Sequence, residues 1–107
     1  MKYARKRDSN HGEIEAVFRK MLGDHVTDTS QLGLGVGDLY VSFGAFPGIF
    51  IEIKRDEKAD FTAHQIRFRN THPKAVLRCE TVEQAIAICG RIRNWALDMT
   101  ILDRSQP

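Results

Sequence analysis

Apolar residues recur along the chain at two spacings, one typical of helices and the other typical of strands. A stripe at helical spacing predicts a helix over residues 10–22, and its members are Ile14, Val17, Phe18 and Met21. Alternation of apolar and polar residues predicts strands over 38–43 and 49–54, joined by a hairpin-like turn at 44–48. Residues 25–32 are expected to be extended and partly exposed.

The second half of the chain alternates helix, strand and helix. Thr62 is a suitable N-cap for a helix through about residue 70, which His72-Pro73 would end. A short strand follows over 74–79, and Thr81 would cap a long helix through about residue 97. The order helix, three strands, helix, strand, helix predicts an α/β fold, with a mixed central sheet flanked by helices in a single small domain.

A chain of 107 residues has room for one domain. We expect a flexible basic arm over residues 1–9, the folded domain over 10–97 and a tail of uncertain structure over 98–107. No apolar run approaches the length of a membrane-spanning helix, and no signal peptide is evident, so a cytoplasmic protein is expected. In that reducing compartment Cys79 and Cys89 are expected to be buried free thiols.

Charged residues within the strand 49–54 require an explanation. Ile49, Ile51 and Ile53 face one side of this strand, whereas Glu52 and Lys54 face the other. Burying either charge without a partner costs several kcal/mol. Pairing across the turn, centred on Phe46, would place Lys54 opposite Asp38 with Glu52 diagonal to it. A structural ion cluster at the end of the sheet is one interpretation of this set.

The other interpretation is catalytic. Two carboxylates can hold Mg²⁺ through oxygen ligands, and a nearby lysine can orient an attacking water or stabilise developing negative charge. Bound Mg²⁺ would lower the pKa of its water and neutralise charge on a phosphate. The residue set Asp38, Glu52 and Lys54 therefore also fits phosphodiester hydrolysis.

The sequence resembles the PD-(D/E)XK nuclease superfamily, and within it the small stand-alone VRR-NUC-type nucleases of phages and bacteria. Gly37-Asp38 is followed, after thirteen residues, by Glu52-Ile53-Lys54. The resemblance covers roughly residues 5–90 and extends to Glu13-Ile14, Phe61-Thr62-Ala63-His64-Gln65 and the segments 75–78 and 81–85. The residue before the aspartate, usually proline in the family, is Gly37 here.

The resemblance implies a restriction-endonuclease-like core and a role for each matching residue. Asp38 and Glu52 would bind Mg²⁺, for which Mn²⁺ would substitute, and Lys54 would be the catalytic lysine. Ile53 would supply a backbone carbonyl to the metal. Glu13 would be the acid of the first helix and would help to bind the metal.

Two of these assignments have structural alternatives. Glu13 stands three residues after Asn10 and could complete a capping box, and Glu15 competes with it as the first-helix acid. Gln65 resembles a family glutamine placed near the metal and the phosphate. It also has capping-box spacing from Thr62.

Positive charge is concentrated rather than abundant, because the net charge is only +2. Basic residues near the site can bind DNA phosphates or can simply be solvated. The candidates for DNA contacts are Arg55, Lys58, His64, Arg67 and Arg69. By resemblance, the expected function is a homodimeric endonuclease acting on branched DNA such as Holliday junctions. A nicking or flap endonuclease in phage DNA processing, or a catalytically inactive DNA-binding module, are the alternatives.

Overall fold

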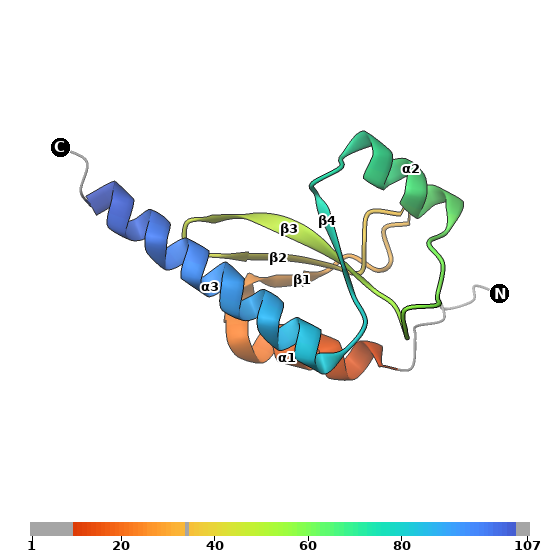
Figure 1. Cartoon of the computed structure of the whole chain (residues 1–107), viewed down its shortest axis with the longest axis horizontal. Coiled ribbons are helices and arrows are strands. Elements are labelled where there is room, and N and C mark those ends of the chain that lie inside the picture. The colour runs from red at the N-terminus through yellow and green to blue at the C-terminus, as the bar shows by residue number, and fades with distance from the viewer. Residues whose placement is uncertain (1–9, 34, 105–107) are drawn as a thin grey trace.

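Eight segments of regular structure follow one another in a computed structural model that describes residues 10–33 and 35–104 (Figure 1). They are α1 (His11–Leu22), the short 3-10 helix η1 (Gly23–His25), β1 (Val26–Asp28), β2 (Leu39–Phe43), β3 (Phe46–Ile53), α2 (Ala63–Thr71), β4 (Val76–Cys79) and α3 (Val82–Arg104). The predicted order of elements is confirmed. The predicted basic arm, residues 1–9, lies outside the described residues.

The four strands form one mixed sheet in the order β1-β2-β3-β4. The pairs β1–β2 and β2–β3 are antiparallel, whereas β3 and β4 are parallel. Because parallel strands need a crossover connection, the chain passes through α2 between β3 and β4. The small α/β domain with a mixed sheet, predicted from the sequence, is therefore confirmed.

The core lies between the sheet and the helices α1 and α3, which together cover one of its faces (Figure 1). The apolar stripe of α1 contributes the fully buried Ile14 and Phe18. Leu39, Val41 and Ile51, on the predicted apolar face of their strands, are also fully buried. Removing this much apolar surface from water is the main force that holds the two layers together.

The opposite face of the sheet carries α2 at one end (Figure 1). An aromatic row connects the sheet to this helix: the rings of Tyr40 and Phe50 lie 5.0 Å apart, and those of Phe50 and Phe68 lie 5.7 Å apart, both edge to face. Such geometry suits the quadrupoles of the rings. The row fixes α2 over the same face that carries Glu52 and Lys54.

The turn between β2 and β3 is shorter than predicted, and the predicted register is wrong. Leu39 pairs with Ile51 and Phe43 with Phe46, so that the turn is only Gly44-Ala45.

Two local features explain this short turn. Gly44 has φ 51°, which a turn this tight favours, and Phe46 is held in the strand by an edge-to-face contact with Trp95 at 5.3 Å. Continuing this register places Glu52, and not Lys54, across from Asp38.

The start of α1 and the end of α3 also differ from expectation. Asn10 is the N-cap residue of α1, but its side chain makes no capping hydrogen bond, so the predicted capping box with Glu13 is wrong. Helix α3 continues to Arg104 rather than ending near residue 97, and it therefore includes most of the predicted tail. Within the described residues, no helix is long and apolar enough to cross a membrane.

Candidate active site

Four polar side chains are buried where β2 and β3 meet the N-terminus of α2. The exposed fractions of Asp38, Glu52, Lys54 and Gln65 are 6%, 2%, 8% and 2%. Three of them are charged at neutral pH in their ordinary states, and charged residues are rarely buried to this degree unless they are paired or functional. The sequence-based prediction that Asp38, Glu52 and Lys54 lie together is consistent with this arrangement.

Asp38 is held by the sheet on both its backbone and its side chain. Its N–H donates to the carbonyl of Ile51 at 2.8 Å, and its carbonyl accepts from Thr29 N at 2.9 Å. Its carboxylate Oδ2 accepts from Ile53 N at 2.8 Å. The Asp38 carboxylate is therefore fixed beside the peptide that follows Glu52.

Lys54 directly follows Ile53, the last residue of β3. Its N–H donates to the Cys79 carbonyl of β4 at 2.9 Å, which orients the backbone. The ammonium Nζ lies 3.8 Å from Glu52 Oε2 and donates to Gln65 Oε1 at 3.0 Å. The ammonium is thus shared between a carboxylate and an amide oxygen.

Gln65 links the lysine to the beginning of α2. Thr62 and Gln65 form a complete capping box, in which Gln65 Oε1 accepts from Thr62 N at 2.8 Å and Thr62 Oγ1 accepts from Gln65 N at 3.2 Å. The predicted cap is confirmed. The same Oε1 also accepts from Lys54, so the cap and the contact with the site coexist in one side chain.

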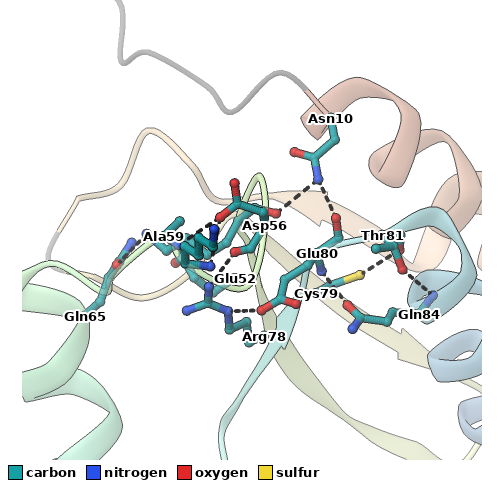
Figure 2. Close-up of polar contacts among 12 residues, drawn as sticks. Asn10, Glu52, Asp56, Ala59, Gln65, Arg78, Cys79, Glu80, Thr81 and Gln84 are labelled. Atoms are coloured by element: carbon teal, nitrogen blue, oxygen red, sulfur yellow. Dashed lines mark hydrogen bonds and ion pairs between the residues drawn. The ribbon is translucent and has the colours of Figure 1, made fainter.

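Asn10 is a connection that the sequence analysis missed, because it read this residue as a helix cap. Its Nδ2 donates to the carbonyl of Lys54 at 3.0 Å and to that of Glu80 at 2.6 Å. Figure 2 shows the bond to Glu80. These carbonyls follow the ends of β3 and β4. Asn10 therefore ties the beginning of α1 to the backbone at the site.

The two candidate acids of α1 have different surroundings. Glu13 is exposed in the first turn of the helix. Glu15 is partly buried, with Oε1 3.2 Å from Nε2 of the buried His11 and Oε2 accepting from Arg19 Nε at 2.9 Å. Glu15 is thus engaged with its own helix, and the role of Glu13 stays a prediction.

The oxygen donors at the site suit a hard cation in kind. No cluster of three or more His, Cys, Asp or Glu side chains placed to hold a metal ion is found in the described ranges, so Glu13 does not join Asp38 and Glu52 in such a group. Mg²⁺ is often held by only one or two carboxylates, with waters and substrate phosphates completing its shell. Asp38, Glu52 and the Ile53 carbonyl fit this mode of binding.

The cysteines are buried thiols without a disulfide, as predicted. Burial raises the pKa of Cys79 to about 11, and Glu80 adds to the effect. Burial, followed by the neighbouring Cys79, raises the pKa of Cys89 to about 11 as well. Both side chains are therefore protonated and poor nucleophiles at neutral pH.

The predicted DNA-contacting residues are all exposed, and they differ in their neighbours. Arg55 Nε lies 3.7 Å from Asp56 Oδ2. Arg69 stacks over the Phe61 ring, with Cζ 4.3 Å from the centroid. Exposure keeps the whole predicted set accessible to a ligand: Arg55, Lys58, His64, Arg67 and Arg69.

Sequence reasoning missed Arg78, whose guanidinium lies beside the same Phe61 ring as that of Arg69. Arg78 lies beside Glu52 in the pairing of β4 with β3, and its Cζ lies 5.2 Å from the Phe61 centroid. Its Nε donates to Glu80 Oε2, and its Nη2 donates to the Asp56 carbonyl at 2.7 Å (Figure 2). The alternation of side chains along β4 places Arg78 and Val76 on one face of the strand. This pattern could have indicated from the sequence that Arg78 lies on the same side of the sheet as Glu52.

The chain matches no protein-family profile, no curated protein and no solved structure.

Proposed function

We propose that this chain is a Mg²⁺-dependent DNA endonuclease of the PD-(D/E)XK type, with a restriction-endonuclease-like core. The observation that carries the proposal is the buried contact of Lys54 Nζ with both Gln65 Oε1 and Glu52 Oε2, beside the anchored Asp38 carboxylate. A plain ion pair needs neither the second carboxylate nor the amide. Their chemistry suits phosphodiester hydrolysis, and their order along the chain is the one that resembles the PD-(D/E)XK superfamily.

Each residue has a distinct task in the proposed reaction. Water attacks the phosphorus in line, a phosphorus–oxygen ester bond breaks, and the departing oxygen takes a proton. Lys54 orients the water and stabilises negative charge that develops on the phosphoryl oxygens. Gln65 holds the ammonium in position through its Oε1, which the capping box itself restrains.

Asp38, Glu52 and the Ile53 carbonyl would hold the metal, and Glu13, which does not join them as a direct ligand, would act on it only through water. Mg²⁺ bound there would supply positive charge for the transition state and a water of lowered pKa. The Ile53 N–H already fixes Asp38 Oδ2 at 2.8 Å, so this carboxylate is oriented without the ion. Such preorganisation reduces the cost of assembling the site.

Branched DNA, such as a four-way junction, is the proposed substrate, and a homodimer is the proposed active form. A domain of 107 residues offers little surface with which to grip a duplex. A two-fold dimer would double the basic surface and set two sites against two strands. Paired nicks follow from that arrangement.

A substrate panel tests this function directly. Labelled four-way junction, flap, nicked and linear duplex DNA are incubated with the protein and with Mg²⁺, Mn²⁺ or EDTA. We expect metal-dependent cleavage, with paired nicks in the junction. Cleavage of another substrate would support the active site but contradict the assignment of branched DNA as the substrate. DNA binding without any cleavage would contradict the enzyme and support a DNA-binding module.

Metal binding is measured separately, by the loss of the free Mn²⁺ signal in electron paramagnetic resonance. The variant Asp38→Asn is expected to weaken Mn²⁺ binding at least ~10-fold, because a ligand charge is lost. The matched control is Asp24→Asn, which removes an exposed carboxylate from η1. Equal Mn²⁺ affinities for the two variants would contradict the assignment of Asp38.

A further inference from the structure

Three cationic groups surround one aromatic ring beside the site. The Arg69 Cζ, Arg78 Cζ and Lys54 Nζ lie 4.3, 5.2 and 5.5 Å from the centroid of Phe61. Phe61 is only partly buried, and it stands in the polar loop between β3 and α2. Attraction between a cation and the negative face of a ring accounts for this gathering of like charges.

Charge compensation is uneven among the three. Lys54 faces Glu52, and Arg78 is paired with Glu80 and anchored on the Asp56 carbonyl. Arg69 has no carboxylate partner among the residues that the structure describes, and its side chain is exposed. Arg69 is therefore the guanidinium of this cluster that remains available for an external anion.

The surroundings of Arg69 leave room for such a ligand. The same residue lines a surface recess of about 310 Å³ together with Ile66, Asn70 and Pro73 on and after α2. Arg69 thus borders Phe61 and this recess. A guanidinium that already lies over an aromatic ring loses less freedom when it binds a phosphate, because the contact restricts its rotamers.

We infer that Phe61 and Arg69 form a phosphate-binding subsite for the DNA strand that enters the active site, with Phe61 as the platform that positions Arg69. The inference rests on the proposed function in taking DNA as the ligand. Lys54 and Arg69 contact the same ring, so a phosphate on Arg69 belongs to the strand whose neighbouring bond reaches Lys54. Arg69 is thus a residue that binds the DNA strand, and Phe61 is a positioning residue that acts through Arg69.

Equilibrium binding separates this role from cleavage. The affinity for a fluorescent four-way junction is measured by anisotropy in EDTA at several salt concentrations, using the full chain. Arg69→Gln is expected to lower the affinity about 3- to 10-fold and to reduce the salt slope by about 1, since one phosphate contact is lost. Arg91→Gln, which removes an exposed charge from α3, is the matched control and is expected to change the affinity less than 2-fold.

The role of the ring is tested without changing any charge. Phe61→Leu is expected to weaken binding about 2- to 5-fold in the wild type and to have no further effect in the Arg69→Gln background. Phe61→Tyr keeps the ring and is expected to bind like the wild type. Equal affinities for Arg69→Gln and Arg91→Gln would overturn the subsite, and a neutral Phe61→Leu would overturn the platform.

The outcomes also distinguish this inference from the proposed function. If the wild type cleaves DNA but Arg69→Gln and Arg91→Gln have equal DNA affinities, the subsite is contradicted and the proposed nuclease function is not. If DNA affinity depends on Arg69 and Phe61 but no DNA is cleaved, the subsite is supported and the proposed nuclease function is contradicted.

Discussion

At the scale of single residues, the central feature is a buried lysine with two unlike partners. A carboxylate alone would satisfy the charge of Lys54, yet its ammonium also donates to the Gln65 amide at 3.0 Å. An amide oxygen accepts a hydrogen bond without neutralising the donor. Gln65 therefore restrains the direction of the ammonium while leaving its positive charge available to a phosphate.

The two functions of Gln65 can be separated by substitution. Gln65→Ala is expected to lower the free energy of unfolding by about 1–2 kcal/mol and cleavage by roughly 10- to 100-fold, because it loses both the cap and the lysine contact. Thr62→Ala removes only the cap, at a cost of about 1 kcal/mol. Urea unfolding and junction cleavage are measured for both. Matching losses of cleavage in the two variants would show that Gln65 acts through helix stability alone.

The buried thiols predict a weakening of the fold at high pH. Because burial raises the pKa of Cys79 and Cys89 to about 11, their protonated forms favour the folded state. This contribution is complete below the ordinary thiol pKa of about 9 and disappears as the pH rises towards 11. Urea midpoints between pH 8 and 11 should fall less in a Cys79→Ala/Cys89→Ala variant than in the wild type. Parallel curves would contradict the assignment to the thiols.

The alternation of residues and the capping rules predicted the strand faces and the helix cap at the site. The strand register and the long-range hydrogen bonds depend on tertiary contacts and could not be predicted in this way. The faces of β2 and β3, and hence the common side of Glu52 and Lys54, follow from their alternating residues. The spacing of Thr62 and Gln65 predicted the capping box. The register failed because a turn length is set by local glycine geometry and by the packing of Phe46 on Trp95. Bonds from Asn10 across the chain leave no local signal.

At the scale of elements, the segment between β1 and β2 lies against the first turn of α2 at Gly35. Gly35 has φ 73°, and a Cβ there would overlap the backbone of His64 and Gln65. The glycine thus permits a close approach of the loop to the first turn of α2. Gln65 is consequently positioned by two elements, the loop on one side and β3 on the other.

A pair of glycines tests this contact. Gly33 has the same φ of 73°, but a Cβ there would meet no atom within 4 Å. Both Gly→Ala variants pay the left-handed strain of about 1–2 kcal/mol. Gly35→Ala is expected to be the less stable of the two in urea and to lose at least ~10-fold more cleavage, because α2 must shift. Similar cleavage by Gly33→Ala and Gly35→Ala would show that the loop does not position Gln65.

At the scale of the whole molecule, the residues that stabilise the fold and the residues of the proposed active site lie on opposite faces of the sheet. Helices α1 and α3 cover one face of the sheet, and α2 lies over the other (Figure 1). The first face holds the apolar core, and the second holds the buried charges and the cations around Phe61. Changes on the α2 side can therefore be made with limited damage to the core. This separation makes the catalytic proposal open to mutational testing.

The proposed dimer is a prediction at this scale. Multi-angle light scattering after size exclusion should give the mass of two chains at micromolar concentration, because paired nicking requires two sites in one particle. The ratio of paired to single nicks should then fall when the protein is diluted below its dissociation constant. A monomer at every concentration, with paired nicking retained, would contradict this account.

The most direct test of the central claim is the Mg²⁺-dependent cleavage rate of a labelled four-way junction by the wild type and by Lys54→Met. Lys74→Met, which removes an exposed lysine from the loop before β4, is the matched control, and circular dichroism checks that each variant is folded. The account predicts a loss of at least ~100-fold for Lys54→Met, in line with the removal of a group that stabilises transition-state charge, and little change for Lys74→Met. A folded Lys54→Met protein that cleaves as fast as the wild type would contradict it.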